Sequence, residues 1–428
     1  MSNKFLIYVL QYYKNKKYVS ILANKIYKQF TMEKISDRLN KMPVSATLAM
    51  AQKSRDLQAQ GVDVINLSIG EPDFDTPQHI KDAAKKAIDD NFTHYPPVPG
   101  YDSLRKAIVE KFKRENNLEF KTEQIVVSTG AKHSIINVFL AILNPGDEVI
   151  VPAPYWVSYP AMVGLAEAEP VYVKCTIDSD FKMTAAQLEA AITPKTRALI
   201  FSSPSNPTGN LYSREELKSL AKVIEKHPNI IVVSDEIYEH INFVGKHESI
   251  AQFPEIKDRV VVVNGVSKGY AMTGWRIGFI GAPAWIAKAV TKLQGQFTSG
   301  ACTIAQKASE AALNAGVEEV HKMTAIFKKR KDAVLEFMKD IPGLKTNIPE
   351  GAFYVFPEVS YFFGKKYEDT IINTSNDLAL YLLDKAHVAT VAGDAFGSPE
   401  CLRLSYATSE ELMLEALKRI KKALSELK

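Results

Sequence analysis

The feature that most constrains the fold is an alternation of short apolar runs with helical stretches between about residues 120 and 300. Several of these runs are apolar throughout, which is typical of strands buried on both faces of a sheet. Strands that alternate with helices along the chain predict an α/β fold, in which helices cover both sides of a mostly parallel sheet. The expected strands are 125–128, 148–152, 170–174, 198–202, 230–234 and 260–264.

Start and stop signals locate two of the helices within this region. A helix is expected from Lys132 to Leu143, because the sequence Asn-Pro-Gly-Asp that follows stops a helix. A second helix is expected to run to Lys226 from Ser213, which opens a capping-box sequence.

The pattern changes beyond residue 300, which indicates a second domain. A long helical stretch is expected there, then two strands and a final amphipathic helix, at 303–340, 351–356, 401–406 and from Ser409 onward. A chain of 428 residues is long enough for two domains. We expect an N-terminal extension, an arm that is also part of the small domain, a large domain and a small α+β domain, at 1–31, 32–75, 76–304 and 305–428.

Composition excludes several classes of protein. The formal net charge is only +4, and no basic stripe indicates nucleic-acid binding. No apolar run reaches the roughly 18 residues of a membrane-spanning helix. The three cysteines are far apart, which favours a reducing, cytoplasmic compartment and argues against a disulfide scaffold or a cysteine metal site. Residues 1–31 are lysine-rich without acidic residues, and we interpret them as a leader before Met32, with a transit peptide as the alternative.

Lys268 is the strongest candidate for covalent chemistry. It follows the expected strand 260–264, with Ser267 directly before it and Arg276 eight residues later. A hydroxyl and a guanidinium suit an anion-binding site around an amine that is held still. Such lysines form Schiff bases with carbonyl compounds, among them the aldehyde of pyridoxal 5'-phosphate.

Two other strand ends carry groups that this cofactor needs. At the strand-to-helix junction 128–132, Gly130 lets the backbone approach a phosphate closely. Asp235 ends an apolar strand, where its carboxylate can keep a pyridine nitrogen protonated, and Tyr238 can reach the ring hydroxyl. Taken alone, the glycine turn is a plain connection and the aspartate is a helix cap. Their assignment to a cofactor site depends on the nearby lysine and arginine.

Further positions complete a candidate pocket. Asn206 lies in a turn fixed by two prolines and a glycine, and Trp156 follows a strand end, although they can also be a bare turn and a core residue. Arg403 lies in an apolar strand, where a buried guanidinium needs an anion. That anion is either a substrate carboxylate, which the backbone at Gly70 can approach, or the partner in a structural ion pair.

Five motifs in this order resemble the class I, fold type I aminotransferases that depend on pyridoxal phosphate. They are Gly-Glu-Pro-Asp-Phe, Ser-Asn-Pro-Thr-Gly, Ser-Asp-Glu-Ile-Tyr, Ser-Lys with an arginine eight residues on, and Arg-Leu-Ser-Tyr-Ala. The resemblance runs from about Leu39 to the C-terminus and is closest to the bacterial aspartate/prephenate (Iγ) group. It implies a seven-stranded sheet, transfer of an α-amino group between L-aspartate or a similar amino acid and 2-oxoglutarate, and a homodimer with shared active sites.

The resemblance also implies a role for each motif residue. Lys268 holds the cofactor and moves the proton, Asp235 pairs with the ring nitrogen, and Arg403 beside Gly70 grips the substrate α-carboxylate. The ring is contacted by Trp156, Asn206 and Tyr238. The phosphate is held by Gly130, Ala131, Ser267 and Arg276 of one subunit and by Tyr95 of the neighbouring subunit. The side-chain carboxylate of an acidic substrate is met by Lys132, which also lies beside the cofactor, and by the Ser45/Thr47 region.

Other activities stay open on the same fold. They are a prephenate or aromatic aminotransferase and a β-lyase that uses the same cofactor. A regulator that only senses pyridoxal phosphate is disfavoured, because residues 1–40 contain no helix-turn-helix for DNA binding. The sequence departs from the family at His94, where relatives often have lysine, and at Ala131, where they often have glycine.

Overall fold

The computed structural model describes residues 35–42 and 44–428. The chain separates into one unit that ends at Pro43 and a second over Val44–Lys428. Within the first unit the described residues form the short helix α3 (Asp37–Asn40). The expected extension 1–31 and its boundary at Met32 lie outside the described residues. No helix in the described ranges is both long and apolar enough to cross a bilayer.

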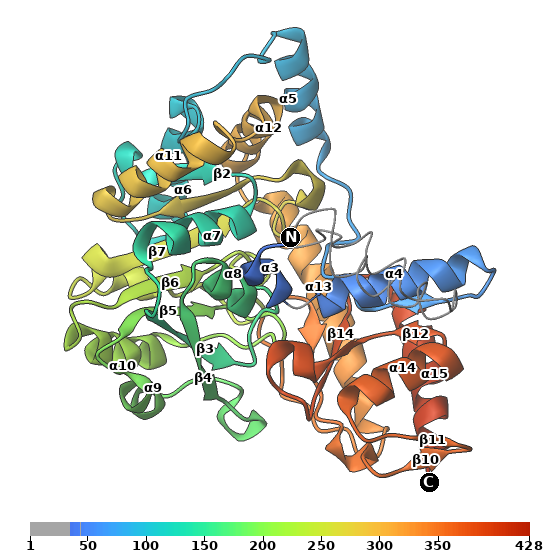
Figure 1. Cartoon of the computed structure of the whole chain (residues 1–428). Coiled ribbons are helices and arrows are strands. Elements are labelled where there is room, and N and C mark those ends of the chain that lie inside the picture. Colours follow the sequence, from blue (N-terminus) through green and yellow to red (C-terminus); the bar gives the residue numbers. More distant parts are fainter. Residues whose placement is uncertain (1–34, 43) are drawn as a thin grey trace, which may run out of the picture. The chain divides into compact units, whose positions relative to one another are not determined.

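A seven-stranded sheet forms the centre of the second unit, as expected (Figure 1). The strands β3, β4, β5, β6 and β7 pair in parallel, whereas β8 runs antiparallel to both of its neighbours. In spatial order the strands are β2 (Ile125–Ser128), β8 (Gly278–Gly281), β7 (Val260–Gly265), β6 (Ile231–Asp235), β5 (Thr196–Ser202), β3 (Glu148–Ala153) and β4 (Glu169–Lys174).

Two hydrophobic cores cover the opposite faces of this sheet. Neighbouring residues of one strand belong to different cores, as Val126 and Val127 do, because successive side chains of a strand point to opposite faces. One core contains residues of α7 (Ala131–Ile142), α8 (Tyr159–Leu165) and α11 (Ala284–Phe297). The other contains residues of α5 (Gln78–Asp89), α6 (Asp102–Asn116), α9 (Ala185–Ala191), α10 (Arg214–Glu225) and α12 (Thr303–Asn314).

The C-terminal elements share a third hydrophobic core with α4 (Ala46–Ala59) and with Ile237, Tyr238 and Ile241, which follow β6. In Figure 1 the helices α14 and α15 lie apart from the strands of the large sheet. The segment at residue 65 belongs with the C-terminal elements, because β1 (Ile65–Asn66) pairs in parallel with β12 (Val388–Ala389). The remaining elements are α13 (Glu318–Lys339), β9 (Tyr354–Val355), β10 (Lys366–Tyr367), β11 (Thr370–Ile371), α14 (Ser375–Lys385), β13 (Val391–Ala392), β14 (Leu402–Ser405) and α15 (Glu410–Ser425).

These features are compatible with the expected domains, but they define no boundary between them. Residues 44–428 form a single compact unit, so the boundaries at 75/76 and 304/305 stay a proposal. The core around the C-terminal elements and the pairing of β1 with β12 favour the interpretation that the arm 32–75 is part of the small domain.

Two expected elements differ from the structure. The helical stretch 303–340 is two helices, α12 and α13, because Gly316 takes a left-handed φ of 86° that ends a helix. Within the strand expected at 351–356, a continuous ladder covers only the two residues of β9, and Gly351 forms an isolated bridge with Asn242. The neighbouring Ala352 has a φ of 55°, which is incompatible with a strand.

Candidate active site

A cavity of about 270 Å³ opens at the carboxyl ends of the parallel strands, where sheets of this kind bind ligands. It brings together residues that are far apart in the sequence, from Gly70 to Arg403. The expected site residues that line it are Gly70, Ala131, Lys132, Trp156, Asn206, Asp235, Tyr238, Ser267, Lys268, Arg276 and Arg403, together with Ser45 and Thr47.

Lys268 lies in the turn that follows β7, and its amine faces this cavity. Its Nζ donates a hydrogen bond of 2.6 Å to the carbonyl oxygen of Gly70. Burial lowers the pKa of this amine to about 8, and Glu71 opposes that shift. A lysine with such a pKa has more free amine near neutral pH than an exposed lysine, which suits a nucleophile for an aldehyde.

Asp235 is the last residue of β6 and is buried. Its carboxylate accepts hydrogen bonds from the Tyr159 hydroxyl at 2.7 Å and from the Ile237 amide at 3.3 Å. Burial raises the pKa of Asp235 to about 6, against the effect of these two bonds. Within residues 44–428 no lysine, arginine or histidine forms an ion pair with it, so a protonated pyridine nitrogen fits as its counter-charge.

The start of α7 forms a cradle for an anion. Gly130 has a φ of 83° and precedes the first helical residue, Ala131, and the first turn contains no acidic residue. A Cβ atom on Gly130 would overlap the guanidinium of Arg276, and one on Gly278 would overlap the backbone nitrogen of Ala131. Helix N-termini bind phosphates through their free N–H groups. The cradle therefore fits the phosphate of the cofactor, with Ser267 at the same cavity.

Arg403 supplies a buried positive charge, with 2% of its surface exposed. Its Nη1 donates to Oδ1 of Asn206 at 2.9 Å and its Nη2 to the carbonyl oxygen of Ser68 at 2.6 Å. The Nε has no hydrogen-bond partner. No carboxylate of the described residues forms an ion pair with Arg403, so the structural ion pair that the sequence left open is absent there. A substrate carboxylate can provide the anion that this guanidinium needs.

Aromatic side chains surround the remaining polar groups. The Tyr238 hydroxyl lies 2.7 Å from that of Tyr354, and burial raises the pKa of Tyr238 well above its ordinary value. The amine of Lys132 lies 4.9 Å from the centre of the Trp156 ring. Burial lowers the pKa of Lys132, as does the nearby Arg276.

Two expected residues do not line the cavity, whereas several residues that were not expected do line it, and two of these are tyrosines. Gly130 lies behind Arg276, and Tyr95 is 91% exposed. Tyr159 and Tyr354 were not foreseen. Tyr159 could have been found, because it stands three residues after Trp156 and such a spacing places both on one side of a helical turn. Tyr354 carries no signal of this kind in the sequence.

An amine of lowered pKa and a buried carboxylate without a cation share one cavity, at the edge of a mostly parallel seven-stranded sheet. This fold and site define the fold type I enzymes that depend on pyridoxal phosphate.

Comparisons with known proteins identify the family. The model of the aminotransferase class I and II family matches residues 62–420, and the chain belongs to that family. A probable aspartate/prephenate aminotransferase of Rickettsia bellii is 50% identical over 92% of this chain and all of the relative. The aspartate/prephenate aminotransferase of Nitrosomonas europaea is 47% identical over the same shares.

Solved structures agree with this assignment. The aspartate aminotransferase of Rhizobium meliloti has a TM-score of 0.90 and 43% identity, over 92% of this chain and the whole of that one. The aspartate aminotransferase of Thermus thermophilus with maleate has a TM-score of 0.86 and 41% identity, with the same coverage. The protein is thus a pyridoxal-phosphate-dependent aminotransferase.

Proposed function

We propose that this aminotransferase moves the α-amino group of L-aspartate or a similar acidic amino acid to 2-oxoglutarate. The observation that carries the proposal is Arg403, a buried guanidinium without a carboxylate partner that faces the same cavity as Lys268. Lys132, a second cation at this cavity, suits the other carboxylate of a dicarboxylic substrate. Relatives named for aspartate, and one solved with the dicarboxylate maleate, support this substrate class.

We further propose the roles of the residues that hold the cofactor. When bound, pyridoxal phosphate supplies an aldehyde that takes up amino groups and a ring that withdraws electrons from the substrate Cα. Asp235, held by Tyr159, keeps the ring nitrogen protonated, and Tyr238 and Asn206 bind the ring oxygen. Trp156 stacks on the ring. Gly130, Ala131, Ser267 and Arg276 bind the phosphate, and Lys132 lies beside it.

Lys268 performs the proton transfer in this proposal. With the cofactor bound, its amine would hold the aldehyde carbon, and a substrate amino group would take that place. The free Nζ would then take the proton from the substrate Cα as a general base and give it up again as a general acid. Arg403 would fix the α-carboxylate, which orients the Cα–H bond toward this amine.

Substrate kinetics of purified variants test the substrate class. We expect Arg403→Gln to lower kcat/KM roughly 100-fold for every amino donor, because a charge-assisted pair is lost. Lys132→Gln, assayed with saturating cofactor, is expected to lower kcat/KM much more for aspartate and glutamate than for alanine, which is the internal control. Equal losses for alanine and aspartate in the Lys132 variant would contradict the acidic-substrate proposal.

Prephenate is the second candidate substrate, because the relatives from Rickettsia and Nitrosomonas are named for aspartate and prephenate together. Prephenate also carries two carboxylates and fits the same pair of cations. Assays with aspartate as donor, and with prephenate or 2-oxoglutarate as acceptor, separate the two. A kcat/KM for prephenate below one thousandth of that for 2-oxoglutarate would reject the second candidate.

We also propose that the protein acts in the cytoplasm as a homodimer in which each active site receives Tyr95 from the other subunit. The 91% exposure of Tyr95 within a single chain supports this, since an aromatic side chain so placed is available to a partner. The absence of any membrane-spanning helix in the described residues is compatible with the compartment.

A further inference from the structure

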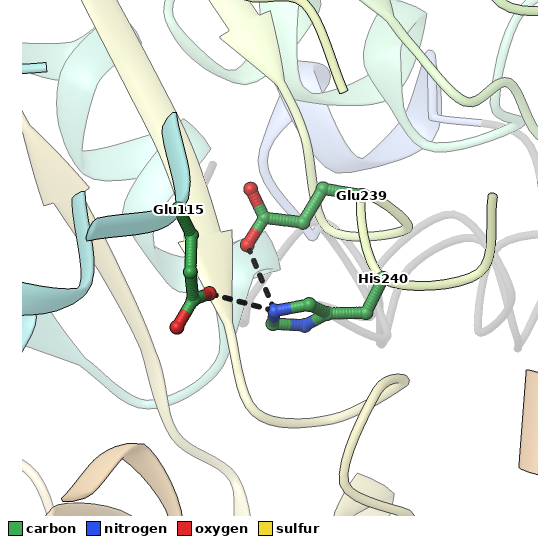
Figure 2. Close-up of side chains that lie close together, drawn as sticks. All are labelled: Glu115, Glu239 and His240. Carbon is green, nitrogen blue, oxygen red and sulfur yellow. Dashed lines mark hydrogen bonds and ion pairs between the residues drawn. The ribbon is translucent and has the colours of Figure 1, made fainter. Parts of the chain in front are cut away.

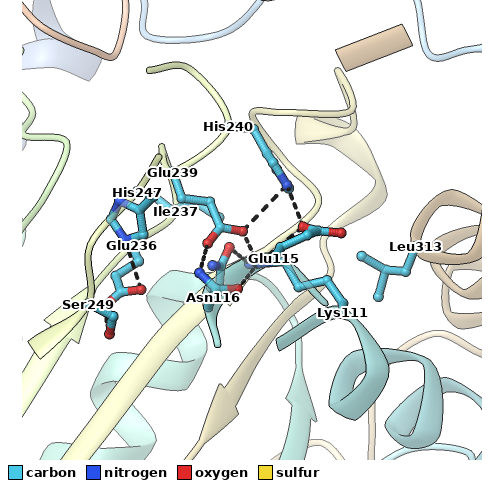
Figure 3. Close-up of polar contacts among 12 residues, drawn as sticks. Lys111, Glu115, Asn116, Glu236, Ile237, Glu239, His240, His247, Ser249 and Leu313 are labelled. Atoms are coloured by element: carbon cyan, nitrogen blue, oxygen red, sulfur yellow. Dashed lines mark hydrogen bonds and ion pairs between the residues drawn. The ribbon is translucent and has the colours of Figure 1, made fainter. Parts of the chain in front are cut away.

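A cluster of charged side chains lies behind the cavity. The end of β6 and the segment that follows it present Asp235 and Tyr238 to the cavity, whereas Glu239 and His240 do not line it. These two residues belong instead to a network with side chains of α6 (Figure 3). We call this network the rear cluster and define it as Lys111, Glu115, Asn116, Glu239 and His240.

Hydrogen bonds and ion pairs join all members of the rear cluster. The Lys111 amine donates to Oδ1 of Asn116 at 2.7 Å and also binds Glu239, whose pKa it helps to hold at about 2 despite burial. Figure 2 shows both carboxylates pointing at one nitrogen of the imidazole. The Nε2 of His240 lies 2.9 Å from Glu115 and 3.5 Å from Glu239. Because two acceptors face it, this nitrogen carries a hydrogen.

The rear cluster is not a metal site, although Glu115, Glu239 and His240 are close enough together to ligate an ion. The ammonium of Lys111 binds Glu239 and lies 3.5 Å from Glu115. It therefore already supplies the positive charge that an ion would bring. A cation would have to displace a buried lysine, which would then lose its carboxylate partners. The cluster is better explained by what its imidazole contacts on the other side.

His240 packs against the residues that directly follow Lys268. A Cβ atom on Gly269 would lie 2.7 Å from the Nδ1 of His240, so only glycine lets the ring come this close. The ring also meets Tyr270 edge to face, with 5.4 Å between centres. The backbone carbonyl of His240 accepts a hydrogen bond of 2.8 Å from the hydroxyl of Thr324 in α13. The ring of His240 thus lies between Glu115 of α6 and the turn after β7.

We propose that His240 is a positioning residue, which the carboxylates of Glu115 and Glu239 hold fixed so that its ring sets the place of Lys268 relative to Asp235. The inference rests on the proposed roles of Lys268 and Asp235 and extends them to a residue that does not touch substrate. Clamped on both sides, the ring has one available orientation. A shift of about 1 Å in a reacting group can lower the rate about 100-fold. A rigid side chain behind the catalytic amine would prevent such a shift.

His240→Ala tests the proposal, with His227→Ala as the matched control. His227 also pairs with a glutamate, Glu189, at 3.2 Å, but both lie at the surface. We expect His240→Ala to lower kcat about 10-fold or more while KM for the amino donor changes less than twofold. The affinity of the apo-protein for pyridoxal phosphate should fall about 10-fold, and the pH at which the bound cofactor's visible absorption titrates should shift. The control should match the wild type in all four readouts.

Glu115→Gln provides a second test that preserves the fold, because this side chain is 15% exposed and keeps its shape. It should change the same readouts in the same direction and by less, since Glu239 still holds the ring. If His240→Ala does not fold, Glu115→Gln decides. The proposal would be overturned if the deciding variant had a lowered melting temperature but unchanged cofactor affinity and an unchanged absorption titration. In that case the rear cluster would be merely structural. Lys268→Ala tests the underlying roles separately, because full activity in that variant would refute them whatever His240 does.

Discussion

At the scale of single residues, the site consists of charges that folding leaves without partners. Within residues 44–428, Asp235 has two neutral hydrogen-bond donors and no cation, and Arg403 has two neutral acceptors and no anion. Desolvating such groups costs free energy unless a counter-charge arrives. The chain therefore loses stability at this site in exchange for the ability to bind a charged cofactor and substrate.

Asp235→Asn is expected to stabilise the apo-protein while it impairs catalysis. The pKa of Asp235 is raised from 3.8 to about 6, so the folded protein binds this proton more tightly than the unfolded chain does. That contribution is present below about pH 4 and is lost as the pH rises through 6, which costs about 3 kcal/mol at neutral pH. Removing the charge should raise the urea midpoint of the apo-protein at pH 8 more than at pH 5.

Asp102→Asn is the control for this prediction. Asp102 is exposed, and its hydrogen bond with Lys106 lowers its pKa, so neutralising it should not stabilise the protein at pH 8. A gain for Asp235→Asn that is the same at both pH values would show that the burial of charge is not the cause.

The sequence was informative about residues whose role follows from a strand end. Asp235 and Lys268 each follow an apolar run, and parallel strands end at the same edge of a sheet, so their proximity could be predicted. The sequence could not predict that no carboxylate among residues 44–428 pairs with Arg403. This absence depends on contacts with Asn206 and Ser68, which are 197 and 335 residues away in the sequence.

At the scale of elements, the antiparallel strand β8 determines the anion cradle. Its first residue, Gly278, packs against the backbone at the start of α7 so closely that no side chain fits between them. The parallel strands were predicted because burial on both faces makes them continuous apolar runs. The strand β8 was not, since it is four residues long and has a glycine at each end, which gives it little strand propensity.

Gly278→Ala is expected to weaken cofactor binding and to destabilise the protein. The added methyl group would overlap the amide of Ala131 and must push α7 away from β8, and overpacking of this kind costs about 2 kcal/mol. The same movement displaces the N–H groups that would bind phosphate. Cofactor affinity by fluorescence titration and the melting temperature measure the two effects.

Gly274→Ala is the matched control, because a Cβ atom there would meet no atom within 4 Å. Gly274 lies four residues before Gly278, in the turn Thr273–Trp275 that leads to β8, and its substitution should leave both quantities close to those of the wild type. Normal cofactor affinity in Gly278→Ala would show that the start of α7 does not hold the phosphate.

At the scale of the whole molecule, the proposed sharing of Tyr95 between subunits makes activity a property of the pair. Tyr95→Ala and Lys268→Ala should each be nearly inactive alone. If both variants are mixed, unfolded and refolded together, about half of the dimers are hybrids, and each hybrid has one site with both native residues. We expect recovery of about a quarter of the wild-type activity.

The measurement is the specific activity of the mixture, compared with that of each variant refolded alone. Recovery should disappear when Lys268→Ala is mixed with the double variant Tyr95→Ala/Lys268→Ala, which cannot form a native site. No recovery in the first mixture, together with dimers seen by sedimentation, would place Tyr95 outside the neighbouring site.

The buried carboxylate of Asp235, which forms no ion pair within residues 44–428, also bears on how long the protein persists. A chain that folds around uncompensated charge is least stable when empty, and every ligand that supplies the missing charge adds to its stability by mass action. When vitamin B6 is scarce, the empty chain opens more often, and proteases degrade the opened form. The amount of enzyme that survives is therefore set in part by the supply of the cofactor that it binds.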